Sequence, residues 1–140
     1  MTTKEYLSQI RMFDKRIRRK TDEVDRLRNV AISIGMDITK ERVQTSGSKD
    51  RVGNSVSAIV DAQNDALRCV AECIKTRSII VDQISTMDKM IYSDVLYLRY
   101  VEGKKYRHIA DELSYSEDYV IHAHTEALAA FEEKYGKEYL

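Results

Sequence analysis

The histidines and cysteines are the side chains of this 140-residue chain with the best chemistry for catalysis or metal binding. His122 and His124 stand two positions apart in a helical pattern, about 200° around the axis, so they cannot share one metal ion, and His108 belongs to another segment. Cys69 and Cys73 share a helix face, but two thiols without further ligands make a poor zinc site, and we expect them to be reduced. The sequence has no glycine-rich phosphate loop and no nucleophile with a base at a suitable spacing. We therefore expect no enzyme, no catalytic residues, no metal and no cofactor.

Two short amphipathic segments in the last third of the chain are separated by a tight turn. Residues 106–113 are expected to form one helix, residues 114–116 the turn, and residues 117 to about 135 the last helix. Apolar residues gather on one face of each helix: Ile109, Ala110 and Leu113 on the first, and Val120, Ala123, Ala127 and Phe131 on the second. Ser116 is well placed as an N-cap, and Glu117 and Asp118 complement the helix dipole. A helix, a three-residue turn and a second helix with a free outer face form a helix-turn-helix, whose second helix lies in the major groove of DNA.

The helix that precedes this pair is predicted over residues 92–102, with Gly103 ending it. Together these three segments resemble region four of bacterial sigma factors over about 40 residues. The resemblance is carried by Leu96, Arg99, Tyr100, Ile109, Ala110, Leu113, Ser116, Val120, Ala127 and Leu128. It implies a promoter-reading domain.

A wider resemblance covers nearly the whole chain and points to the ArpU/RinA-like late transcriptional regulators of phages and prophages. It is carried by Tyr6, Leu7, Ile10, Asp14 and Lys15 near the N-terminus, and by the run RVQTSGSKDRVGN at residues 42–54. The resemblance implies a regulator of phage late genes that acts on double-stranded DNA in the cytoplasm of a bacterial host.

The DNA-facing positions implied by the sigma-like resemblance fall on the last helix. They are Glu117, Asp118, Ile121, His122 and Thr125 for base edges, with backbone contacts from Arg99, Lys104, Lys105, Arg107 and Ser116. His122 or Thr125 can donate to a base or a phosphate, and Ile121 can touch a thymine methyl group. This chain departs from the family in the acids Glu117, Asp118 and Glu126, where relatives often have Arg or Lys, and in Ser114, where they have a turn glycine.

Charge is distributed unevenly, although the formal net charge is zero. Residues 1–91 hold 17 Lys/Arg against 13 Asp/Glu, and residues 92–140 hold 6 against 10, so the two parts carry +4 and −4. The densest basic run is Lys15, Arg16, Arg18, Arg19 and Lys20, which is either a second phosphate contact or a solvated helix face. The acidic C-terminal part favours an alternative, a coiled-coil adaptor or assembly protein whose helix-turn-helix contacts RNA polymerase or the phage packaging machinery instead of DNA.

Long helices are expected in the first two thirds of the chain, because proline is absent and only five glycines occur. Apolar residues follow a four-three spacing from Tyr6 to Ile34 and again from Val52 to Ile91. The first helix is expected to open at Thr2 or Thr3 and to end at Gly35, and residues 36–53 are read as a loop.

A second apolar row on the second long helix, Val60, Leu67, Ile74 and Val81, widens its stripe beyond what one partner helix needs. This favours a homodimer, although the C-terminal domain is the other candidate to cover the row.

The sequence thus predicts an all-α fold with a long antiparallel helical hairpin over residues 1–91 and a three-helix helix-turn-helix domain over residues 92–140. The apolar runs are shorter than the roughly 18 residues that a membrane span needs, and the first residues lack a secretory signal's apolar core, so we expect a cytoplasmic protein without membrane contact.

Overall fold

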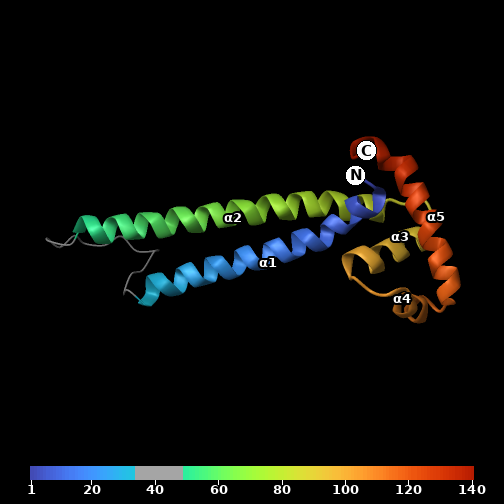
Figure 1. Cartoon of the computed structure of the whole chain (residues 1–140), viewed down its shortest axis with the longest axis horizontal. Helices are drawn as coiled ribbons and strands as arrows, with labels where there is room; N and C mark the ends of the chain where they lie inside the picture. Colours follow the sequence, from blue (N-terminus) through green and yellow to red (C-terminus); the bar gives the residue numbers. More distant parts are fainter. Residues whose placement is uncertain (34–48) are drawn as a thin grey trace. The chain divides into compact units, whose positions relative to one another are not determined.

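The computed structural model describes residues 1–33 and 49–140, with side chains of the second helix described from Ser55 onward (Figure 1). The α-helices are α1 (Thr3–Ser33), α2 (Lys49–Ser85), α3 (Met90–Leu96), α4 (Tyr106–Leu113) and α5 (Glu117–Tyr135). A π-helical turn η1 (Tyr97–Val101) follows α3, and a 3₁₀ turn η2 (Gly136–Glu138) follows α5. The expected all-α class is confirmed, since every regular element of these described residues is helical.

The chain divides into two compact units, one of residues 1–14 and 75–140 and the other of residues 15–74. This differs from the expected boundary at residue 91. The physical reason is that Leu7 and Ile10, from the first turns of α1, are fully buried in one cluster with Ile84, Leu96 and Phe131. The beginning of α1 and the end of α2 are therefore part of the C-terminal core.

The start of α1 is set by a reciprocal cap. The Glu5 amide donates to Thr2 Oγ1 at 3.2 Å, and the Thr2 amide donates to the Glu5 carboxylate at 2.6 Å. Two orphan donors of the first turn are satisfied in this way, as in a capping box. The expected opening near Thr2 or Thr3 is confirmed, whereas the expected end at Gly35 lies outside the described residues.

Two of the expected boundaries of α2 are wrong. The helix begins at Lys49, so residues 49–53 are helical and not part of a loop, and residues 36–48 of that loop lie outside the described residues. A glycine such as Gly53 costs only about 1 kcal/mol inside a helix relative to alanine, which the rest of a long helix readily offsets.

The C-terminal end of α2 is at Ser85, not at Ile91. Thr86 Oγ1 donates to the Gln83 carbonyl at 2.9 Å, and Lys134 Nζ donates to the Thr86 carbonyl at 2.5 Å, so carbonyls at the helix end find partners outside the helix. Met87 is turned into the core, where it is 9% exposed. These tertiary contacts end the helix without a glycine or a proline.

The segment expected as one helix over residues 92–102 is also different. The helix α3 starts two residues earlier, at Met90, and changes into the π-helical turn at Tyr97, where the Glu102 amide donates to the Tyr97 carbonyl at 3.2 Å. Gly103 ends the segment as expected, with a φ of 69° that favours glycine.

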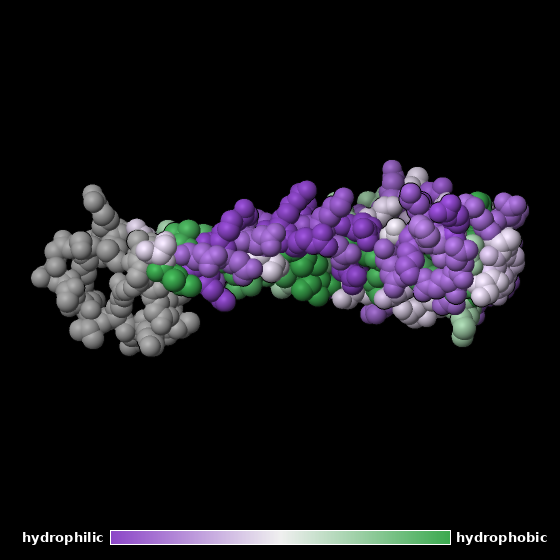
Figure 2. Space-filling model, turned by 90° about the horizontal axis from the view of Figure 1, so that it is seen from below, coloured by the Kyte–Doolittle hydropathy of each residue, from purple (hydrophilic) through white to green (hydrophobic). Residues whose placement is uncertain are grey.

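In the unit of residues 15–74, the two long helices lie side by side and bury Val24, Ala31, Ala66 and Cys73 between them. Hydrophilic residues cover most of the face seen in Figure 2, and hydrophobic residues gather in patches along the helices. None of the described helices combines the length and the apolar character needed to cross a membrane.

Candidate functional site

The helices α4 and α5 are joined by a three-residue turn, as the sequence predicted (Figure 1). Ser114 takes the left-handed conformation, with φ 61° and ψ 40°, and the Tyr115 amide donates to the Ala110 carbonyl at 2.9 Å. This closes the end of α4 in the way that a glycine usually does. Ser114 therefore adopts the left-handed conformation that a turn glycine usually takes.

Ser116 caps α5, as expected from the sequence. Its hydroxyl oxygen accepts from the Tyr119 amide at 3.1 Å, while its backbone stays extended. Such a cap contributes about 1 kcal/mol to helix stability. The first turn of α5 is thereby fixed at the point where the outer face of the helix begins.

The crossing of α4 and α5 is held by a small apolar cluster. It consists of Val95, Leu98, Ile109, Ala110, Val120 and Ala123, all of which are buried. Ala110 is 3% exposed, so a larger side chain at this position has no room without separating the helices. The inner face of α5 is thus buried in the protein's own core.

His124 is a buried polar residue on this inner face. It is 3% exposed, its Nε2 lies 2.8 Å from the Tyr100 hydroxyl, and its Nδ1 lies 3.4 Å from the Tyr106 hydroxyl. Burial, with smaller contributions from the charges of Lys4 and Arg99, lowers the pKa of His124 to about 4. The imidazole is therefore neutral at physiological pH, and it links α5 to the segments before it.

The outer face of α5 is exposed. Glu117, Asp118, Ile121, His122 and Thr125, the residues expected to face DNA bases, all lie on it, and Ile121 is 41% exposed. The Thr125 hydroxyl donates to the Ile121 carbonyl at 3.1 Å, which leaves its lone pairs open to a donor. The five side chains thus share one solvent-facing surface, here called the α5 outer face.

The cations expected to contact the DNA backbone fall into two groups. Arg99 is partly buried, donates to the Lys104 carbonyl at 3.0 Å and stacks 4.4 Å over the Tyr106 ring. Lys104 pairs with Glu112 and, at 3.0 Å, with Glu102, and its hydrogen bond to Glu112 raises its pKa. These two cations hold the segment between η1 and α4 in place.

Lys105 and Arg107 differ from them because both are exposed and neither forms an ion pair within the described part of the chain. They stand just before and inside the first turn of α4, where helix-turn-helix proteins commonly touch the DNA backbone. Their charges are the ones most available to phosphate.

Acidic residues dominate the rest of this region. Between Arg107 and Lys134 the sequence has no Lys or Arg, but it has the acids Asp111, Glu112, Glu117, Asp118, Glu126, Glu132 and Glu133. Like charges repel phosphate, so base contacts and the two exposed cations must offset this repulsion if the α5 outer face meets DNA.

Tyr115 and Tyr119 form an exposed aromatic pair beside the turn. Their rings stack at 4.4 Å between centroids, and the residues are 47% and 45% exposed. Their spacing of four across the Ser116 cap brings the two side chains together at the start of the helix.

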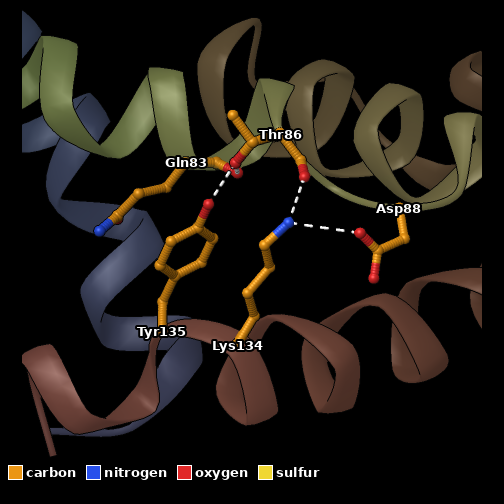
Figure 3. A network of polar contacts seen from close by, with 5 residues as sticks. All are labelled: Gln83, Thr86, Asp88, Lys134 and Tyr135. Atoms are coloured by element: carbon orange, nitrogen blue, oxygen red, sulfur yellow. Dashed lines mark hydrogen bonds and ion pairs between the residues drawn. The ribbon is translucent and has the colours of Figure 1, made fainter.

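The C-terminal half of α5 is anchored to the end of α2 by a polar network (Figure 3). Lys134 donates to the Thr86 carbonyl at 2.5 Å and pairs with Asp88 at 3.3 Å, and the Tyr135 hydroxyl hydrogen-bonds to Thr86 Oγ1. At the same end of the chain, Thr3 Oγ1 donates to Glu132 at 3.0 Å. The helix that carries the candidate site is therefore fixed at both ends.

The basic run from Lys15 to Lys20 lies in the other compact unit, that of residues 15–74. Lys15, Arg16, Arg18 and Arg19 are exposed on α1, and Lys20 pairs with Glu23 at 3.1 Å. In the same unit, burial raises the pKa of the Cys73 thiol. In the described residues, no His, Cys, Asp and Glu side chains gather into a group that could hold a metal ion.

Comparison of the chain with protein-family models, with curated proteins and with solved structures finds no match in any of the three.

Proposed function

We propose that this protein is a DNA-binding transcription regulator that docks α5 in the major groove, acting as a homodimer on phage late genes in the bacterial cytoplasm. The observation that supports the proposal is the α5 outer face. Five adjacent side chains on one capped helix are exposed, while the opposite face of that helix is packed against α4. A helix presented in this way after a three-residue turn has the form of a recognition helix.

Each side chain of the α5 outer face has a distinct chemistry for base edges. Ile121 offers an apolar contact for a thymine methyl group, His122 offers a donor or an acceptor, and Thr125 offers the lone pairs of its hydroxyl. Glu117 and Asp118 can accept from a cytosine amino group. Lys105 and Arg107 supply contacts to phosphate. Because the acids repel phosphate, base contacts must supply a larger share of the DNA affinity than is usual. We therefore expect weak non-specific binding and a small salt dependence.

The test is a fluorescence-anisotropy titration of duplex DNA selected from a random pool by the full chain, at two salt concentrations. Arg107→Ala should weaken all sequences alike and lower the salt slope by about one. His122→Ala or Thr125→Ala should change the preference for one or two bases. Lys137→Ala removes an exposed cation near the C-terminus and is the matched control, which should bind as the unchanged chain does. Equal binding by all four variants contradicts the groove assignment.

A second candidate function is supported by the seven acids between Arg107 and Lys134. Among them Glu117 and Asp118, with the exposed Tyr115 and Tyr119 beside them, suit a basic patch on a protein partner such as RNA polymerase, because arginine and lysine pair with carboxylates and stack on aromatic rings. Asp118→Lys separates the two candidates. It should weaken a polymerase complex, whereas on DNA it should raise non-specific affinity.

A further inference from the structure

A stripe of large apolar side chains alternating with smaller ones runs along the outer side of α2 within the unit of residues 15–74. Its members recur at the three-four spacing of a coiled-coil seam and are Ser57, Val60, Asn64, Leu67, Ala71 and Ile74, here called the α2 outer stripe. Leu67 is 50% exposed and Ile74 is 48% exposed, whereas Ala66 and Cys73, on the side of α2 that faces α1, are 2% and 4% exposed. The α2 helix therefore carries a second seam, which α1 does not cover.

Side-chain size alternates along this stripe. Val60, Leu67 and Ile74 occupy one of the two seam positions, and the smaller Ser57, Asn64 and Ala71 occupy the other. A shallow hollow on the surface is lined by Asn64, Leu67, Arg68 and Ala71, where the seam has small side chains. A surface with regular bulges and regular hollows at equal spacing can fit a second copy of itself.

We propose that the α2 outer stripe binds the same stripe of a second copy of this chain in antiparallel orientation, around a two-fold axis between residues 65 and 66. In this register Leu67 of each copy lies against the partner's Asn64, Val60 against the partner's Ala71, and Ile74 against the partner's Ser57. Every layer then pairs a large side chain with a small one, which fills the seam evenly.

A parallel pair fits this sequence less well. Equal residues would then meet, so layers of two large side chains such as Leu67 would alternate with layers of two small ones such as Ala71. The second kind leaves a cavity, which costs stability. The alternation of size thus selects the antiparallel orientation.

Charge complementarity supports the same register. The exposed residues that flank the stripe on one side are Asp61 and Arg68, seven positions apart. The antiparallel register places Asp61 of each copy beside the partner's Arg68, which gives two ion pairs across the interface. Within one chain Arg68 already pairs with Asp65, and that exposed pair can add the partner's Asp61 without breaking.

Asn64 is the polar seam residue next to the two-fold axis, and Ser57 is the other polar residue of the stripe. The two Asn64 amides stand on either side of the two-fold axis, offset by about 4.5 Å along the helix, so they can hydrogen-bond to each other. A polar residue at one seam position fixes register at some cost in stability. The stripe spans about 27 Å, which is short for a standard interface, so we expect a dimer that dissociates at micromolar concentrations.

Sedimentation velocity over a concentration series tests the surface. Leu67→Glu should raise the dissociation constant of the dimer at least about tenfold, because it places a charge in the seam. Ile79→Glu is the matched control, since Ile79 is 48% exposed on α2 but lies off the stripe, and it should leave the constant unchanged. Asp61→Arg alone should weaken the dimer, and adding Arg68→Asp should restore it. A chain that stays monomeric, or a dimer that Leu67→Glu leaves intact, overturns the proposal.

Pulsed electron paramagnetic resonance tests the orientation. Spin labels are placed one at a time at residues 58, 65 and 72, which share one helix face, after Cys69 and Cys73 have been replaced. In the antiparallel register the two labels at residue 65 lie almost level along the helices, so their separation should be the shortest. The two labels at residue 58, and likewise those at residue 72, are offset by about 20 Å along the helices, so their separations should be longer. Three equal separations indicate a parallel pair and contradict the proposal, as does any other order. Neither experiment contains DNA, so failure of this dimer and failure of DNA binding are separate results.

Discussion

The neutral, buried imidazole of His124 makes the stability of the protein depend on pH in a predictable direction. Its side chain is 3% exposed, and its pKa is lowered from 6.5 to about 4, chiefly by burial. In the unfolded chain the same group titrates near 6.5. Between these two values the unfolded state binds the proton and the folded state does not, so lowering the pH favours unfolding.

The size of the effect follows from the interval between the two pKa values. Each pH unit of difference corresponds to about 1.4 kcal/mol, so the free energy of unfolding should fall by roughly 3 kcal/mol in all between about pH 6.5 and pH 4. The stabilisation is fully present above pH 6.5. Tyr100, which contacts His124 at 2.8 Å, stays protonated over this range, since burial raises its pKa to about 12.

Urea unfolding followed by circular dichroism at pH 7, 5.5 and 4.5 measures this dependence. His124→Gln keeps a polar side chain but has no titration, so it should remove most of the pH slope, at a cost of about 1–2 kcal/mol at pH 7 from poorer packing. His122→Gln is the matched control, because His122 is exposed on the same helix. The reasoning is refuted if His124→Gln and the unchanged chain lose stability in parallel as the pH falls.

Three further predictions concern Gly103, Ser116 and the two cysteines. Gly103→Ala should destabilise the protein by at least about 1 kcal/mol in urea unfolding, because Gly103 has a φ of 69° and an added Cβ would lie 2.8 Å from the Arg11 guanidinium carbon. An unchanged unfolding midpoint would contradict this prediction. Ser116→Ala should cost about 1 kcal/mol and Ser116→Asp much less, since only the second keeps an acceptor for the capped amide, and equal losses would show that the cap contributes nothing. Cys69 should react with a thiol reagent such as dithionitrobenzoate well before Cys73, because Cys73 is buried and burial raises its pKa. Single-cysteine variants that react at the same rate would contradict this prediction.

Local signals were sufficient to predict the elements of the candidate site. The spacing of Ile109, Ala110 and Leu113, the turn, and the Ser116 cap gave the correct bounds of α4 and α5, because capping and turn chemistry depend on residues close in sequence. The exposure of Ile121 and Thr125 follows from the same periodicity, since Val120 and Ala123 occupy the buried face.

Features decided by distant contacts could not be predicted. The end of α2 depends on Lys134, which is 48 positions from Thr86 along the chain, and the start of α1 belongs to the C-terminal core because Thr3 meets Tyr139 at 2.9 Å. The roles of Arg99 and Lys104 likewise depend on partners that folding brings to them.

His124 is an intermediate case between these two. It shares its helix face with Val120 and Phe131, which the apolar periodicity assigns to the core, but only the structure reveals that His124 is buried there and that two tyrosine hydroxyls satisfy its ring.

Nuclear magnetic resonance titration of the isotope-labelled chain with duplex DNA that the protein selects from a random pool tests the central claim most directly. The amide shifts of Asp118, Ile121, His122 and Thr125 should change with DNA concentration, and those of the buried Val120 and Ala127 should change least. Shifts confined to the basic run from Lys15 to Arg19, or no shifts at all, would contradict a groove-reading role for the α5 outer face.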